Sequence, residues 1–338
     1  MVIYNIIIRL LAWLFRCAAW FNPKARTFVN GRKNFFQILK KAFQGQGQKV
    51  IWVHCASLGE FEQGRPVMEA IRQEFPNFKI LLTFFSPSGY EVRKNFPGAD
   101  YIFYLPWDTP ANAKRFVTIA NPILAIFIKY EFWHNFSREL KKKKIPQLSV
   151  SSIFREDQVF FKPYGSIFRK TLKNFNYFFV QNEISVRLLQ SIGIHNCMFS
   201  GDTRFDRVNE MVKKGEEISI AKKFKNNDKV LVAGSCWQDD IDILIPFINE
   251  NRLKFIIAPH EIDETFISGL EESLEVKSIR FSRVTETNLE GVQVLIIDNI
   301  GLLSRLYSYG EFAYVGGAFG KGLHNILEAA CYGIPILF

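Results

Sequence analysis

The sequence predicts an α/β fold with two doubly wound parallel sheets. Short continuous apolar runs alternate with amphipathic segments, which is the pattern that strand–helix–strand units produce. The alternation extends from Val50 to Val180, stops in the polar stretch 213–228, and restarts at Lys229. The chain has 338 residues, of which 48% are hydrophobic, enough for two domains with large cores.

The first domain, assigned to residues 35–208, is organised around its first strand. Val50–Val53 is the kind of apolar run that is buried on both faces of a parallel sheet. A helix follows, and Glu60 lies where strand gives way to helix. Gly59 beside it is interpreted as a point where another group approaches the backbone closely. Five further strands are expected at 80–85, 101–105, 124–128, 148–153 and 177–180.

Polar side chains follow several of these strands. Glu60 follows the first strand and Glu131 follows the run that ends at Ile128. Ligands of open parallel sheets bind outside the carboxyl ends of the strands, so both carboxylates are expected at the ligand edge. The next two strands are followed by Ser151, Ser152, Arg155, Gln181, Asn182 and Glu183. The simpler interpretation of each is a helix cap; as a group they predict the lining of a site.

The net charge and the cysteine content indicate which partners and compartment suit the protein. The formal charge of +10 suits a protein that handles phosphorylated substrates, nucleotides or an acidic membrane surface. No nucleic-acid recognition module is found, so we expect no nucleic-acid partner. The five cysteines are scattered and form no CxxC pair, which predicts neither a zinc site nor a disulfide framework. We expect no metal site and a reducing cytoplasmic setting.

Residues 1–22 are almost entirely apolar and predict a membrane anchor or an interfacial helix. Asn5, Arg9 and Arg16 share one narrow face of a helical wheel, and the remainder is mainly Ile, Leu, Trp and Phe. Basic residues follow, which favours a cytoplasmic position for the next domain. The alternatives are a secretory signal, for which no convincing cleavage site is found, and a helix packed on its own domain.

The second domain is assigned to residues 226–338. Strands are expected at 229–236, 254–261 and 292–298, with Pro259 and His260 at a ligand edge. A later strand ends at Gly316 and Gly317, and a Gly-rich loop through Gly322 leads to a short helix. Exposed N–H groups in such a loop, together with a helix start, predict a phosphate site. The loop is neither a Walker motif nor a dinucleotide fingerprint. The chain stops in a strand that has just begun, so we expect the domain to be truncated.

Four segments, in the same order, resemble the 3-deoxy-D-manno-octulosonic acid (Kdo) transferases, glycosyltransferases with the GT-B fold. WVHCASLGEFEQGRP resembles the segment with the catalytic glutamate, and KYEFWHN resembles a Glu-Leu-Trp-Pro-Asn segment. SGDTRFD resembles Gly-Asn-Leu-Lys-Phe-Asp, and VGGAFGKGLHNILEAACYGIPILF resembles the Gly-Gly…His-Asn-Pro-Leu-Glu-Pro segment. The resemblance spans nearly the whole chain and implies the GT-B fold.

The resemblance also implies site residues. Glu60 matches the catalytic base, and Glu131 and Arg204 match positions that stabilise the transition state. Arg204 stands in place of the usual lysine, which changes the geometry of the contact. Leu302 and Ile326 replace a glutamate and a proline, and Pro259-His260-Glu261 lacks one arginine. The implied CMP contacts are Pro259, His260, Gly301, Leu302, Leu303, Asn325, Ile326, Leu327 and Glu328.

The implied activity is transfer of Kdo from CMP-Kdo to the lipid A precursor, lipid IVA, in lipopolysaccharide biosynthesis of Gram-negative bacteria. The implied location is the cytoplasmic side of the inner membrane, with membrane lipid as a further partner. We expect an inverting mechanism that uses no cofactor. Two alternatives stay open: another GT-B nucleotide-sugar glycosyltransferase or epimerase, and a membrane-bound sugar-binding protein without catalysis.

Overall fold

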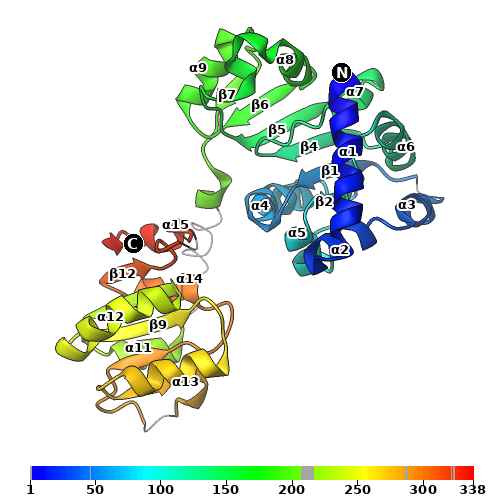
Figure 1. Cartoon of the computed structure of the whole chain (residues 1–338). Coiled ribbons are helices and arrows are strands. Elements are labelled where there is room, and N and C mark those ends of the chain that lie inside the picture. The colour runs from blue at the N-terminus through cyan, green and yellow to red at the C-terminus, as the bar shows by residue number, and fades with distance from the viewer. Residues whose placement is uncertain (1, 46, 207–216, 286–287, 321, 323) are drawn as a thin grey trace. The chain divides into compact units, whose positions relative to one another are not determined.

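The structure is a computed structural model that describes residues 2–45, 47–206, 217–285, 288–320, 322 and 324–338 (Figure 1). The chain divides into two compact units, Met1–Arg204 and Phe205–Phe338. Each unit is an α/β domain built on a parallel sheet, so the predicted fold class is confirmed at this level. The two units are described separately below.

The first sheet has the strand order β3-β2-β1-β4-β5-β6-β7, and all its ladders are parallel. Its order reverses between β1 and β4, and this is where ligands of doubly wound sheets bind. The six predicted strands are confirmed, and a short edge strand, β7, was not predicted. The strands are β1 (Val50–Cys55), β2 (Lys79–Phe84), β3 (Tyr101–Tyr104), β4 (Leu124–Ile128), β5 (Gln147–Ser152), β6 (Tyr177–Val180) and β7 (Cys197–Phe199).

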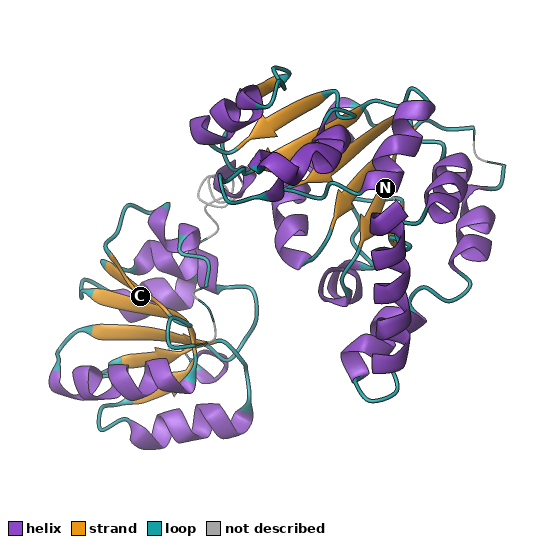
Figure 2. Cartoon of the chain, turned by 45° about the horizontal axis from the view of Figure 1, so that its top comes forward, coloured by secondary structure: helices purple, strands orange, loops and turns teal. Residues whose placement is uncertain are grey.

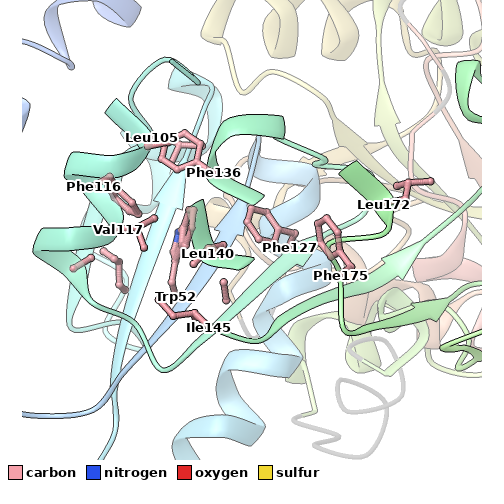
Figure 3. Close-up of a cluster of buried hydrophobic side chains, with 14 of the residues drawn as sticks. Trp52, Leu105, Phe116, Val117, Phe127, Phe136, Leu140, Ile145, Leu172 and Phe175 are labelled. Carbon is pink, nitrogen blue, oxygen red and sulfur yellow. The ribbon is translucent and has the colours of Figure 1, made fainter. Parts of the chain in front are cut away.

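Helices cover both faces of this sheet (Figure 2). One face packs on α3 (Phe35–Phe43), α6 (Pro110–Ala120) and α7 (His134–Lys142) through a cluster centred on the fully buried Trp52 (Figure 3). The other face packs on α4 (Leu58–Glu74) and α5 (Pro87–Arg93). The strands therefore present side chains to a core on both sides, which explains their continuous apolar runs. Two further helices are α8 (Ser166–Leu172) and α9 (Glu183–Ser191), with 3-10 turns Val159–Phe161 and Pro163–Gly165.

Close packing of α4 on the sheet depends on Gly64. A Cβ atom at Gly64 would lie 2.9 Å from Cys55 Sγ and 3.0 Å from an Ile128 side-chain carbon. At Gly59, a Cβ atom would meet only Ser57 Oγ, at 3.8 Å. No group of the described protein approaches Gly59 closely, so its interpretation stays a prediction, and the helix contacts the strands at Gly64, in its second turn.

The amino-terminal helix α1 (Val2–Ala18) is attached to the domain by polar contacts. Tyr4 Oη donates to Asp108 Oδ2 at 2.6 Å, and Asn135 Nδ2 donates to Asn5 Oδ1 at 2.8 Å. Asp108 and Asn135 follow β3 and β4, so α1 lies at the carboxyl edge of the sheet. Large apolar side chains of α1 remain exposed, including Ile3 at 71% and Trp13 at 58%. Among the described residues, no helix has the length and apolarity needed to cross a membrane. The next helix is α2 (Pro23–Asn30).

The second sheet has the order β10-β11-β9-β8-β12-β13, also fully parallel. Its order reverses between β8 and β12, which places a second ligand edge beside these two strands. The strands are β8 (Val230–Cys236), β9 (Lys254–Pro259), β10 (Ser278–Arg280), β11 (Val294–Ile296), β12 (Phe312–Val315) and β13 (Ile336–Leu337). The helices of the described part are α11 (Ser219–Lys225), α12 (Gln238–Glu250), α13 (Glu264–Ser273), α14 (Leu303–Leu306) and α15 (Leu327–Ala330), with 3-10 turns Phe281–Arg283 and Tyr307–Tyr309.

Candidate active site

Glu60 lies in the first turn of α4, directly after β1 and beside the switch point of the first sheet. Its carboxylate accepts a hydrogen bond from Ser57 Oγ and lies 3.6 Å from Lys129 Nζ. Burial alone would raise the pKa of Glu60, but the Ser57 hydrogen bond and the Lys129 charge outweigh it and hold the pKa below its usual value. Glu60 is therefore an ionised carboxylate at neutral pH, as a general base requires.

Glu131 follows β4, the strand next to β1, and is held by an indole. Trp133 Nε1 donates to Glu131 Oε2 at 2.9 Å and lies 3.1 Å from His54 Nε2. His54 is fully buried in β1, and its Nδ1 lies 3.1 Å from the Thr83 carbonyl oxygen. If Nδ1 donates to that carbonyl, Nε2 is free to accept from the indole. The two adjacent strands thus bring Glu60 and Glu131 to one edge, and both charges raise the pKa of Cys55, which burial already raises.

Lys129 is a site residue that the sequence analysis did not single out. It lies between β4 and Glu131 in the chain, and its Nζ is 3.6 Å from Glu60 Oε1. Its backbone has φ = 63°, a left-handed conformation that non-glycine residues seldom adopt and that is common at functional sites. Ser149 and Ser152 hydroxyls both hydrogen-bond to its carbonyl oxygen. Its place directly after a predicted strand was the signal available in the sequence.

Arg204 is linked to α4, the helix that carries Glu60, by an ion pair with Asp202. Arg204 Nε and Nη2 lie 2.8 and 2.6 Å from Asp202 Oδ2, and Gln63 Nε2 donates to Asp202 Oδ1 at 3.1 Å. Gln63 is fully buried and stands one helical turn after Glu60. Burial would raise the pKa of Asp202, but Arg204 more than offsets it, so the pKa lies below the usual value. The structure thus ties Arg204 to the helix that carries Glu60.

Other polar residues at this edge serve the backbone. Gln181 Nε2 donates to the Ser151 carbonyl at 2.9 Å, and Ser151 has φ = 55°. Asn182 caps α9 by accepting from the Ser185 N–H. For Asn182 the helix-cap interpretation is therefore the correct one.

In the second domain, the first part of the Gly-rich loop is held internally. The Gly316 N–H donates to the Gly234 carbonyl at 2.9 Å, and the Gly317 N–H donates to the Asp240 carboxylate at 3.1 Å. Asp240 is 1% exposed and also accepts from Tyr314 Oη and from the Trp237 N–H. The prediction that Gly316 and Gly317 offer these N–H groups to a phosphate is therefore wrong, because both have partners inside the domain. Gly322, exposed at φ = 96°, stays a prediction.

Three aromatic rings meet at the ligand edge of the second sheet. His260, exposed at the end of β9, stacks on Trp237 and on His324, with ring centroids 4.3 Å apart in each pair. Trp237 Nε1 lies 3.0 Å from His324 Nε2, so the indole and this imidazole are joined edge to edge beneath His260. Burial and the neighbouring His260 lower the pKa of His324, although Asp240 opposes the shift. A neutral His324 can accept the indole proton.

Some of the other predicted CMP contacts pack in the core of the second domain, and others have polar hydrogen-bonding groups or a glycine backbone. Leu302, Leu303 and Ile326 pack against the core of the domain, so their side chains already have apolar partners. Asn325 lies just before the four-residue helix α15; its Oδ1 accepts from the Leu327 N–H, and its Nδ2 lies 3.3 Å from Glu328 Oε1. Gly301 has φ = 97°, which favours glycine. Pro259 is the last residue of β9.

Comparisons with known proteins agree with this geometry. Residues 31–207 match the family described as 3-deoxy-D-manno-octulosonic-acid transferase (kdotransferase). The 3-deoxy-D-manno-octulosonic acid transferase of Aquifex aeolicus is 30% identical over 317 residues, covering 90% of this chain and 80% of that protein. The enzyme of the same name from Haemophilus influenzae is 26% identical over 308 residues, covering 85% and 70%.

Solved structures show the same fold. The UDP-GlcNAc 2-epimerase of Neisseria meningitidis aligns with a TM-score of 0.55 at 16% identity, covering 86% of this chain and 81% of the epimerase. Similarity at this level shows the fold alone, two Rossmann-like domains of the GT-B type. The family match and the Aquifex relative carry the identification. The chain belongs to the 3-deoxy-D-manno-octulosonic acid transferase family of glycosyltransferases.

Proposed function

We propose that this glycosyltransferase transfers Kdo from CMP-Kdo to lipid IVA with inversion, and that Glu60 is the general base. The observation that carries the proposal is the state of Glu60, a carboxylate kept ionised by Ser57 and Lys129 at the switch point of the sheet. Glu60 takes the proton of the acceptor hydroxyl as its oxygen attacks the anomeric carbon of Kdo. The bond from that carbon to the phosphate oxygen breaks, and CMP leaves. No metal or cofactor takes part in the proposed step.

Charged groups around Glu60 are proposed to stabilise the charge that develops in the transition state. Glu131 and Arg204 are proposed to stabilise the transition state, the first as an anion facing positive charge on the sugar. Trp133 fixes the Glu131 carboxylate at 2.9 Å, and Asp202 fixes the Arg204 guanidinium, so both are oriented before substrate arrives. Lys129 keeps the base ionised. It contributes no proton to the reaction.

The second domain is proposed to bind the CMP group. His260 and Asn325 stand after β9 and after β12, at the edge where nucleotides bind in sheets of this kind. The exposed His260 ring and the stacked Trp237 and His324 rings offer a polar aromatic surface. Pro259, Gly301 and Glu328 complete the proposed CMP contacts, together with the backbone at Leu302, Leu303, Ile326 and Leu327.

We further propose that α1 holds the enzyme on the cytoplasmic side of the inner membrane. Ile8 and Phe15 pack on the domain, but most apolar side chains of α1 do not, and Ile3, Ile6 and Leu10 are 71%, 58% and 53% exposed. A helix of this kind lies in the interface with its apolar side in the lipid. Arg16, Lys33 and Arg115 line a 540 Å³ cavity beside its carboxyl end, which suits anionic head groups.

Mass spectrometry of a transfer reaction tests the proposal. The chain, CMP-Kdo and lipid IVA should yield an acceptor heavier by one or more Kdo units. Glu60→Gln should abolish transfer and keep CMP binding, because the substitution removes the base alone. Glu69→Gln removes a partly exposed carboxylate on the same helix, paired with Arg65; it is the matched control and should retain activity. Transfer by Glu60→Gln at a near-native rate would reject the base assignment.

Ligand specificity separates this proposal from its alternatives. CMP should raise the thermal unfolding temperature, and UDP should not. Protection by UDP alone would point to another GT-B glycosyltransferase or an epimerase. CMP binding without transfer to any acceptor would point to a sugar-binding protein.

A further inference from the structure

An apolar cavity of 380 Å³ adjoins the segment that carries Glu131. Tyr130 and Phe132, the residues on either side of Glu131, form part of its wall. Helices α1 and α8 also contribute, with Ile3 and Ile7 from the first and Ile167 and Phe168 from the second, and the 3-10 turn Val159–Phe161 adds two more apolar residues. The mouth is apolar too, because Ile3, Ile167 and Phe168 are 71%, 43% and 40% exposed. Exposed apolar side chains around an apolar cavity indicate an apolar ligand.

One polar side chain in the wall has an unused hydrogen-bonding atom. His134 lines the cavity and is 8% exposed, and its Nδ1 lies 2.8 Å from Thr171 Oγ1. Its Nε2 is buried and has no hydrogen-bond partner within the described ranges. Burial, aided by the charge of Arg138, lowers the pKa of His134, so the imidazole is neutral at pH 7. A buried unpaired nitrogen is costly unless a ligand satisfies it, and a neutral one suits a hydroxyl or carbonyl better than a phosphate.

We propose that this cavity binds an acyl chain of the lipid acceptor, and that His134 Nε2 hydrogen-bonds to a hydroxyl or carbonyl group on that chain. The inference rests on the proposed function, because it assumes a lipid acceptor. It identifies a part of the acceptor that the Glu60 and Glu131 chemistry does not touch. The bound chain would hold the sugar head group beside the two carboxylates.

The position of the cavity beside Glu131 favours an acyl chain of the acceptor as its ligand. The hydroxyl that reacts and the acyl chain belong to one molecule, so a chain seated between Tyr130 and Phe132 keeps the hydroxyl near the Glu131 carboxylate. The exposed apolar side of α1 continues from the cavity mouth at Ile3 and Ile7. An acceptor can therefore extend one chain into the cavity while the rest of its lipid stays in the membrane. A bilayer phospholipid has no hydroxyl that must be held beside the reacting carboxylates, so the position of the cavity does not favour it.

Filling the cavity tests the proposal. Ile167→Trp places a large ring at the cavity wall, and Ile184→Trp is the matched control on α9, 52% exposed and away from this cavity. Steady-state kinetics would be measured with CMP-Kdo and two acceptors, lipid IVA and its fully deacylated disaccharide. Ile167→Trp should raise KM for lipid IVA about tenfold, the equivalent of excluding roughly two methylene groups. KM for the deacylated acceptor should not change, and the control should match the wild type.

The outcomes separate this inference from the proposed function. An equal change in KM for both acceptors, or no change for either, would overturn the inference while leaving the proposed function intact. So would a loss of binding to phospholipid vesicles by Ile167→Trp with an unchanged KM for lipid IVA, since the cavity would then hold a bilayer lipid. Absence of transfer to either acceptor by the wild type would reject the proposed function itself.

A second variant tests the polar contact. His134→Leu combined with Thr171→Val removes both members of the buried pair, so no orphaned partner remains. This double variant should lose any preference for acceptors with hydroxylated chains over acceptors with plain chains, while its kcat on the deacylated acceptor stays at the wild-type value. An unchanged preference would overturn the role assigned to Nε2.

Discussion

Replacing Asp240 with alanine should destabilise the second domain strongly. Asp240 is 1% exposed and lies at the start of α12. Its carboxylate accepts from the Trp237 N–H at 2.7 Å, from Tyr314 Oη at 2.7 Å and from the Gly317 N–H at 3.1 Å. These three donors come from the helix start, from β12 and from the Gly-rich loop. One side chain therefore joins three elements at the proposed nucleotide edge.

The size of the effect follows from the orphaned donors. A buried donor left without a partner costs about 1–3 kcal/mol. Alanine at position 240 leaves three such donors, but water can enter the space that the carboxylate leaves and satisfy part of them. We expect a loss of ~3–5 kcal/mol in the free energy of unfolding of this domain. Asp240→Asn keeps one acceptor oxygen and should lose less.

Fluorine NMR of protein labelled with 5-fluorotryptophan can monitor the unfolding of the second domain separately from that of the first. The chain has six tryptophans, and Trp237 is the only one in residues 205–338. A urea titration of the Trp237 signal therefore reports the unfolding of the second domain. Asp242→Ala, in an exposed pair with Gln238, is the control and should change the free energy of unfolding by less than about 0.5 kcal/mol.

Two results would refute this reasoning. The first is a loss of less than about 1 kcal/mol in Asp240→Ala, well below the cost of its orphaned donors. The second comes from a double-mutant cycle with Tyr314→Phe, which removes one of these donors. The two changes should cost less together than the sum of the single changes, by about 1 kcal/mol. Strict additivity would mean that the Asp240–Tyr314 contact carries no energy.

Three further predictions concern charge and packing. Lys129→Met removes the cation that lowers the pKa of Glu60, so the acid limb of kcat/KM should move to higher pH in a pH–rate profile; an unmoved limb would contradict this. Because folding lowers the pKa of His324, the second domain should lose stability as pH falls through about 6.5, and His324→Gln should flatten that dependence in urea titrations at pH 5 to 8. Gly64→Ala should destabilise the first domain by about 1–2 kcal/mol in thermal unfolding, whereas Gly59→Ala should be neutral or stabilising, since its Cβ meets open space. Equal effects of the two alanines would contradict the packing argument.

The sequence alone determined the six long strands of the first sheet and the edge at which the carboxylates lie, although it missed the short edge strand β7. A strand of a doubly wound sheet is buried on both faces, so its apolar run is continuous and its end is visible in the sequence. Leu124–Ile128 and Tyr177–Val180 were predicted with the bounds that the structure has. Glu60 and Glu131 follow such runs, so their position at the carboxyl edge required no structure. The family motifs then gave them roles.

Only the tertiary structure decided which of these groups meet. The strand order makes β1 and β4 neighbours, and this brings Lys129 to Glu60 and Trp133 to His54. A pattern of apolar residues does not encode strand order, because any buried strand satisfies the same pattern. The tie from Gln63 through Asp202 to Arg204 joins residues far apart in the chain for the same reason.

The sequence also does not show which glycine packs against a strand or which side of an amphipathic helix faces the domain. The sequence contains Gly59 and Gly64 on one helix, and only the packing of α4 on Cys55 and Ile128 shows that Gly64 is the one that must lack a Cβ. For α1, the helical wheel separates polar from apolar residues but does not say which side faces the domain. Asp108 and Asn135 decide it by hydrogen-bonding to Tyr4 and Asn5. Ile8 and Phe15 pack on the domain from the same side of the helix as Tyr4, so turning the helix over would break these contacts and leave Asp108 without a hydrogen bond.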